Sequence, residues 1–291
     1  MSRHIVRLDF WGVGVRVDLP TAVDQEHFSF QFRNHLVEEP AEGPDQQSAQ
    51  DLTVVFRSDG DVPWCRAVLD PGIRKDIWIK TGGGEAQLYD SWLRGSSRPS
   101  PLPPLGFPPL AGEFRAVHAA CALPADGGPG IVVTGESGAG KSSILLYLLE
   151  SGHLYGGDDL VPVSRSGIRP YLRTMNIRTA TLRSLPAGLQ ERIREHGRPM
   201  ETPSGVTYLV QPADLGYPSA AAEVVTEVHR VHLTAADAFS AEVQADGRLA
   251  IGWDAPRHRA EAMSAVGQYV RSAKPFRFAP DGISAKAAVA A

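Results

Sequence analysis

The feature that most constrains this chain is a glycine-rich segment directly after a short run of β-branched residues. Residues 131–134 read Ile-Val-Val-Thr, which is typical of a buried parallel strand, and residues 135–142 read Gly-Glu-Ser-Gly-Ala-Gly-Lys-Ser. The second stretch fits Gly-x-x-x-x-Gly-Lys-Ser, the pattern of a phosphate-binding loop between a strand and a helix. Its glycines let successive backbone N–H groups converge on one point, at which the following helix also directs its N-terminal dipole. The segment therefore predicts a nucleotide site.

Each residue type in this loop has an expected contact. Lys141 can reach the β- and γ-phosphates, and the Ser142 hydroxyl can hold Mg²⁺. We therefore expect ATP as co-substrate and Mg²⁺ as cofactor. The expected nucleotide-binding residues are Gly135, Glu136, Ser137, Gly138, Ala139, Gly140, Lys141, Ser142 and Ser143.

Two adjacent acids follow the loop at short spacing. Asp158 and Asp159 stand seventeen and eighteen residues after Lys141, and Gly152 is a natural stop for the intervening helix. A strand that begins near residue 153 would deliver both acids beside the phosphates. Neighbouring carboxylates in a strand point to opposite faces, so one can bind Mg²⁺ while the other takes a proton from a hydroxyl nucleophile. The alternative, a solvated turn after a strand, is disfavoured by the nearby loop.

At this point the sequence resembles a known family, the C-terminal catalytic domain of HPr kinase/phosphorylase and its kinase-like relatives. The resemblance covers about residues 105–235. It is carried by the loop 135–142, Gly152-His153, Asp158-Asp159 and, upstream, Val117-His118-Ala119-Ala120. The order is specific, because ordinary phosphate-loop NTPases place the acid on the Mg²⁺ side much later in the chain.

The resemblance implies a role for each matching residue. Asp158 would be the catalytic base, and His118 would lie near the transferring group. From the residue types we further expect Asp159 to hold Mg²⁺ together with Ser142, and Lys141 to act as the third catalytic residue by neutralising developing charge. Residue type alone leaves His118 open, since it also fits a satisfied histidine within a strand. Arg173, Arg178 and Arg183 are likewise either guanidinium clamps for phosphate or acceptor, or members of a solvated face.

The chain also departs from the family. The bifunctional enzymes carry an acidic residue directly after the loop serine, where this chain has Ser143, and residues 171–178 do not match the signature of their phosphorylase reaction. The resemblance therefore extends to transfer of the γ-phosphoryl group of ATP to a hydroxyl. The expected acceptor is a Ser or Thr of a peptide or small protein, such as a natural-product precursor peptide. A small-molecule hydroxyl kinase and a non-catalytic nucleotide-binding regulatory module remain as alternatives, and the resemblance leaves a homo-oligomer open.

Composition favours a soluble cytoplasmic enzyme. The 291 residues include 29 basic and 33 acidic side chains, so the net charge of −4 gives no basic field for nucleic acid. The apolar runs are too short to span a membrane. Cys65 and Cys121 are far apart without metal spacing, which predicts free thiols in a reducing compartment.

We expect an α/β protein with two domains. The catalytic part is expected to be a P-loop kinase domain with a central, largely parallel sheet, preceded by a small β-rich domain. Alternation of apolar and polar residues predicts half-buried antiparallel strands in residues 5–10, 14–19, 28–32, 52–56 and 77–79. The expected boundaries are 1–96 for the β-rich domain, 97–110 for a Pro-rich linker, 111–283 for the catalytic domain and 284–291 for a flexible tail.

Overall fold

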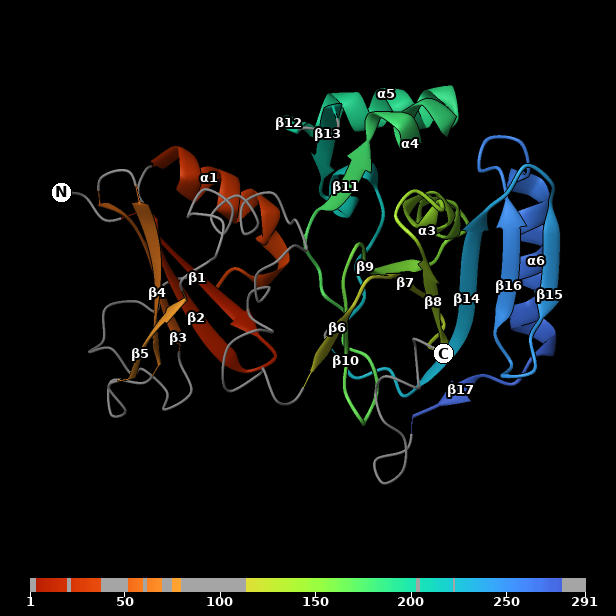
Figure 1. Ribbon diagram of the computed structural model, residues 1–291, viewed down its shortest axis with the longest axis horizontal. Coiled ribbons are helices and arrows are strands. Elements are labelled where there is room, and N and C mark those ends of the chain that lie inside the picture. The colour runs from red at the N-terminus through yellow and green to blue at the C-terminus, as the bar shows by residue number, and fades with distance from the viewer. Residues whose placement is uncertain are drawn as a thin grey trace. The chain divides into compact units, whose positions relative to one another are not determined.

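The computed structural model describes residues 4–19, 22–37, 52–59, 62–69, 75–79, 114–202, 205–221 and 223–278. The chain divides into two compact units, residues 1–114 and 115–291, each with its own β-sheet (Figure 1). The linker predicted at 97–110 and the tail predicted at 284–291 lie outside the described residues. Among the helices that are described, none combines the length and the apolar character needed to cross a membrane.

The first unit contains a five-stranded sheet in the order β1-β2-β3-β4-β5. Its elements are β1 (His4–Phe10), β2 (Val13–Leu19), α1 (Ala22–Gln31), the short 3₁₀ helix η1 (Arg33–His35), β3 (Leu52–Asp59), β4 (Val62–Leu69) and β5 (Lys75–Ile79). The β1–β2 hairpin closes through Trp11 and Gly12, which both have positive φ, as a two-residue hairpin turn requires. The strand pairs are antiparallel except β2–β3, which is parallel because α1 lies in the connection between them.

One strand predicted in this unit is wrong. Residues 28–32 alternate apolar and polar, but residues 22–31 form the helix α1. Phe28 and Phe32 lie four residues apart, on one side of the helical path, with ring centroids 4.8 Å apart. Both are buried, and the ring of Phe32 also contacts that of Phe10 on β1. Burial of the Phe28–Phe32 pair against the sheet therefore favours the helix over the strand that the alternation predicted.

The second unit combines one large sheet with two small ones and helices around them. Its strands are β6 (Arg115–Val117), β7 (Ala120–Leu123), β8 (Gly130–Gly135), β9 (Leu154–Gly157), β10 (Val161–Val163), β11 (Met175–Arg178), β12 (Arg198–Thr202), β13 (Gly205–Val210), β14 (Glu227–Ala235), β15 (Ser240–Val243), β16 (Leu249–Trp253) and β17 (Phe276–Arg277). Its helices are α3 (Lys141–Glu150), α4 (Thr179–Ser184), α5 (Ala187–His196), the 3₁₀ helix η3 (Pro212–Leu215) and α6 (Arg259–Ser272).

The large sheet is mixed, so the largely parallel sheet expected from the sequence is wrong. Its order is β15-β16-β14-β8-β7-β9, with β17 added beside β14. Only β8–β14 and β14–β16 are parallel pairs, because short connections return β7 to β8 and β15 to β16 as antiparallel hairpins. After the two acids the chain forms the separate strand β10, which pairs with β6 and not with the large sheet.

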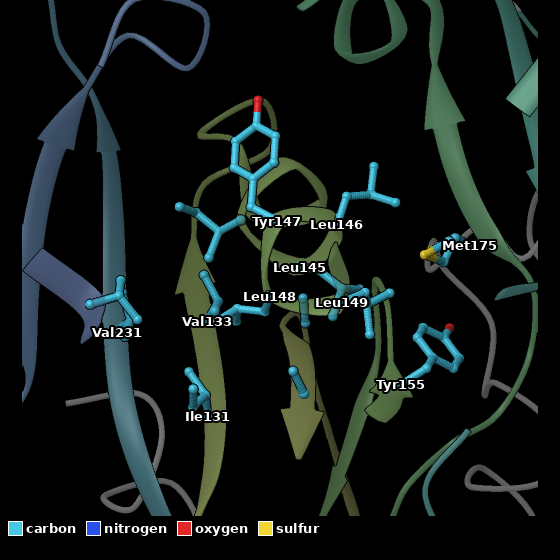
Figure 2. Close-up of a cluster of buried hydrophobic side chains, with 14 of the residues drawn as sticks. Ile131, Val133, Leu145, Leu146, Tyr147, Leu148, Leu149, Tyr155, Met175 and Val231 are labelled. Atoms are coloured by element: carbon cyan, nitrogen blue, oxygen red, sulfur yellow. The ribbon is translucent and has the colours of Figure 1, made fainter. Parts of the chain in front are cut away.

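The helix after the phosphate loop is buried on almost every side. From Ser143 to Leu149 every residue of α3 is buried, against Ile131 and Val133 of β8 and Tyr155 of β9 among others (Figure 2). A helix that is apolar all round belongs in the interior of a domain. This packing fixes the loop end of α3 against the sheet.

Cys121 of β7 is a free, buried thiol, and burial raises its pKa to about 12.

Strand direction brings the predicted site together at one edge of this sheet. β14 runs parallel to β8, and β9 runs in the same direction as β8 because both are antiparallel to β7. The carboxyl ends of β8, β9 and β14 therefore lie at the same edge. The loop follows β8 and the two acids follow β9, which places both at that edge.

Candidate functional site

The phosphate loop joins β8 to α3 through three glycines with positive φ, Gly135, Gly138 and Gly140. The N–H of Ala139 donates to the carbonyl of Glu136 (3.2 Å), which closes a turn within the loop. The helix begins at Lys141, and the first backbone N–H groups of any α-helix, here those of Lys141 to Ser143, lack intrahelical acceptors. They form a positive helix N-terminus beside the loop.

A tryptophan at the end of β16 supports the loop from the side. The indole N–H of Trp253 donates to the carbonyl of Ala139 (2.8 Å), and the Trp253 side chain is buried. Its ring also lies against Gly140, where a Cβ atom would come within 2.6 Å of Trp253 Cζ2. Gly140 is therefore required both by its left-handed backbone and by the ring beside it. Nothing in the loop motif itself signals Trp253, which lies more than a hundred residues later.

Lys141 is held over the loop by the loop's own carbonyl groups. Its Nζ donates to the carbonyls of Gly135 and Glu136, each at 2.9 Å. Burial lowers the pKa of Lys141, and the charge of Arg178 adds to this, while Asp159 and Asp158 oppose it. The amine thus lies at the loop, where a polyphosphate would replace or share these carbonyl contacts.

The hydroxyl of Ser142 meets the first of the two acids. Ser142 Oγ donates to Asp158, lying 3.0 Å from Oδ1 and 3.2 Å from Oδ2, and the N–H of Asn176 on β11 lies 3.4 Å from Oδ2. Asp158 is only 2% exposed. Burial, and next the charge of Asp159, raise the pKa of Asp158 to about 6, against the opposing effects of Ser142, Asn176 and Arg173. A nearby cation would stabilise the charged form of this buried carboxylate.

The second acid has different partners. Asp159 Oδ1 lies 3.0 Å from His118 Nδ1, and its Oδ2 accepts a hydrogen bond from Arg173 Nη2 at 3.1 Å. Burial favours protonation of Asp159, but the hydrogen bond from His118 and the charges of Arg173 and His118 outweigh it and lower the pKa. The hydrogen bond to Asp159 in turn raises the pKa of His118, whose side chain is 41% exposed. The two acids contact different partners, but they lie in a bend after β9 and not in the strand from which their opposite directions were predicted.

The backbone of Asp159 adopts a left-handed conformation, with φ of 67°. Asp tolerates this region better than most residues, and such backbone strain is concentrated at functional sites. The backbone carbonyl of Asp159 also lies 2.9 Å from His118 Nδ1, so the imidazole contacts both the backbone and the side chain of Asp159. His118 itself is placed in the short bend between β6 and β7 and not inside a strand.

The structure thus distributes contacts differently from the roles that the resemblance implied. The predicted base, Asp158, is the acid that contacts Ser142, whereas the predicted metal ligand, Asp159, contacts His118 and Arg173. Arg173 is nearly fully buried and is not part of a solvated face. The predicted nucleotide contact Ser143 has a buried side chain in the first turn of α3, so only its backbone N–H is suited to a phosphate.

Two further side chains reach the loop. Arg178, at the end of β11, donates from Nη1 to the hydroxyl of Ser137 (3.1 Å), which places a guanidinium at the loop. His232 of β14 contacts the hydroxyl of Thr134 through Nδ1 (3.0 Å), at the end of β8. Arg178 was one of three arginines that the sequence singled out. No sequence signal distinguished His232 as a neighbour of the loop.

No protein-family model matches the chain, and no curated protein matches it. Among solved structures, the Hpr(Ser) kinase/phosphatase from Coxiella burnetii is similar to 54% of this chain and 94% of its own length, with 17% sequence identity and a TM-score of 0.28. A similarity of this degree carries no argument about activity.

Proposed function

We propose that this protein is a kinase that transfers the γ-phosphoryl group of ATP to a hydroxyl group. The observation that carries the proposal is the meeting of the phosphate loop with the acid pair, through the contact between Ser142 and Asp158. Phosphoryl transfer passes through a loose transition state, so positioning and charge stabilisation supply most of the rate. The N–H groups of residues 136–143, apart from that of Ala139, and the amine of Lys141 would provide that stabilisation.

Ser142 and Asp158 are the residues suited to hold Mg²⁺. A hydroxyl oxygen and both oxygens of a buried carboxylate lie together there, and oxygen ligands of this kind suit a hard divalent cation. When bound, the cation would neutralise charge on the β- and γ-phosphates. This assignment exchanges the roles expected for the two acids, because Asp158, and not Asp159, contacts Ser142.

The Asp159–His118 pair is then available to the acceptor. Since Asp159 engages Nδ1 of His118, Nε2 is the ring nitrogen that can take the proton of the incoming hydroxyl. In that step the acceptor oxygen bonds to the γ-phosphorus, the bond from the γ-phosphorus to the β–γ bridging oxygen of ATP breaks, and ADP leaves. Arg173 would hold Asp159 in place from its other side.

The acceptor that we propose is a Ser or Thr hydroxyl of a peptide or small protein. The exposed imidazole of His118 supports this choice, because a large acceptor must reach the proton-accepting group from solvent. A small-molecule kinase would use the same groups inside an enclosed acceptor cavity. A regulatory module would bind ATP without transferring phosphate, and the neighbouring acids, loop and histidine argue against it.

Incubation with [γ-³²P]ATP, Mg²⁺ and a positional library of Ser/Thr peptides tests the proposal. The wild-type protein should label hydroxyl-bearing peptides, and His118→Gln should bind ATP but lose labelling. Asp158→Asn should also lose labelling and depend less on Mg²⁺ for nucleotide binding. His196→Gln removes an imidazole of the same exposure on α5 and should change nothing. Labelling by both site variants at the wild-type rate would rule out the assigned roles.

A further inference from the structure

A pocket lies at the carboxyl ends of the strands of the large sheet, on the side of the phosphate loop that is opposite to the two acids. It is open to solvent and has a volume of about 400 Å³, within the range of about 300–1,000 Å³ usual for small-molecule sites. Its lining comes from Gly138 and Ala139 of the loop, from residues 235–237 where β14 ends, and from residues 253–256 where β16 ends. The pocket is therefore continuous with the loop.

The order of strands gives the site a direction. β14 and β16 lie on one side of β8, and β7 and β9 lie on the other (Figure 1). The pocket follows β14 and β16, whereas Asp158 and Asp159 follow β9. A polyphosphate on the loop that presents its terminal phosphate to the acids must therefore extend its other end toward the pocket.

The chemistry of the pocket suits the uncharged end of such a ligand. Alanine side chains and the exposed Pro256 supply apolar surface, while the carboxylates of Asp237 and Asp254 accept hydrogen bonds and repel phosphate. Asp254 Oδ2 already lies 3.5 Å from Nε of Arg257. Asp237, exposed in the loop between β14 and β15, is thus the carboxylate better placed to accept a hydrogen bond from a ligand.

We propose that this pocket binds the nucleoside end of the nucleotide, and that Asp237 accepts a hydrogen bond from an exocyclic amino group of the base. Adenine and guanine both carry such a group, whereas hypoxanthine, the base of ITP, does not. The proposal rests on the nucleotide site proposed above and adds to it the pocket that selects the base.

Calorimetric titration with Mg²⁺ and four probes tests this subsite: ATP, GTP, ITP and inorganic tripolyphosphate. The wild-type protein should bind ATP or GTP more tightly than ITP by about 5-fold, the effect of one hydrogen bond, and more tightly than tripolyphosphate. Whichever of ATP and GTP shows the advantage identifies the base. Asp237→Ala should abolish the advantage over ITP without weakening tripolyphosphate binding. Asp126→Ala, an exposed acid in the turn before β8, is the matched control.

A pocket-filling variant provides a second readout. Ala236→Trp should reduce ATP affinity to that of tripolyphosphate while leaving tripolyphosphate affinity unchanged, with folding checked by circular dichroism. Equal affinities of the wild-type protein for ATP, GTP and ITP would overturn the subsite, as would wild-type selectivity in Asp237→Ala. Failure to bind any of the four probes would overturn both proposals. Selective binding without phosphoryl transfer would uphold the subsite and reject only the kinase.

Discussion

The hydroxyl of Ser142 lies 3.0 Å and 3.2 Å from the two carboxylate oxygens of Asp158. A hydroxyl beside the phosphate loop and a carboxylate that follows β9 therefore form one cluster of oxygen atoms. Asp158 comes seventeen residues after Lys141, the first residue of α3. The cluster forms because β8 and β9 run in the same direction and end at the same edge of the sheet.

Ser142→Ala should reduce the affinity for ATP by about 10-fold in the presence of Mg²⁺, but not in the presence of EDTA. The variant removes one cation ligand. It also leaves the buried Asp158 without its hydroxyl donor, and the loss of a hydrogen-bond partner by a buried polar group costs about 1–3 kcal/mol of stability. Calorimetric titration under both conditions measures the difference. Ser272→Ala, which removes a hydroxyl at the end of α6, serves as the control. An equal loss with and without Mg²⁺ would count against the cation assignment.

Gly140→Ala should damage the loop far more than Gly138→Ala. The two glycines have φ of 93° and 91°, so alanine carries the same backbone penalty of about 1 kcal/mol at both positions. At Gly140 the new Cβ would also lie 2.6 Å from Trp253 Cζ2, whereas nothing lies within 4 Å at Gly138. We expect about 1–3 kcal/mol of additional destabilisation for Gly140→Ala, with loss of ATP binding. Thermal denaturation and ATP titration of both variants measure it, and equal effects would contradict the role of Trp253.

Arg178→Gln should lower the rate of ADP formation by on the order of 10-fold or more, with a smaller change in ATP affinity. The guanidinium contacts Ser137 in the loop, and its charge contributes to lowering the pKa of Lys141, so it is placed to stabilise charge on a bound phosphate. Arg183→Gln, at an exposed position on α4, is the matched control. The turnover number and the dissociation constant, measured separately, distinguish the two effects. A wild-type turnover number in Arg178→Gln would show that Arg178 does not stabilise the transferred phosphate.

His35 should make the first unit less stable at acidic pH. Burial lowers the pKa of His35 from 6.5 to about 4, against the opposing contact with Asp9. The folded state binds the proton more weakly than the unfolded chain, so this stabilising contribution is complete above pH 6.5 and is lost as the pH falls toward 4. The loss should reach about 3 kcal/mol.

Amide hydrogen exchange of peptides from residues 4–37, corrected for intrinsic rates, should show this loss in the wild-type protein. His35→Gln does not titrate in this range and should show a flatter pH dependence. An identical dependence in both proteins would contradict the prediction for His35.

The sequence predicted the local features of the site well and its tertiary partners poorly. The loop, the helix after it and the strand before Asp158 follow from glycine placement and apolar patterning, which are local properties. The contacts of Asp159 with His118 and Arg173, and of Ala139 with Trp253, join residues that only the fold brings together. The same limit explains residues 28–32, where packing of Phe28 and Phe32 on the sheet, and not the alternation, decides the structure.

The most direct test of the account is the affinity of the wild-type protein and of Lys141→Ala for Mg²⁺·ATP, measured by calorimetric titration. Lys141 Nζ lies 2.9 Å from two carbonyls of the loop, where the phosphates are expected to bind. We expect saturable binding by the wild-type protein, with a dissociation constant of roughly 1 μM to 1 mM, and an affinity at least about 10-fold lower in Lys141→Ala. Absence of binding in the wild-type protein, or equal affinity in the two proteins, would contradict it.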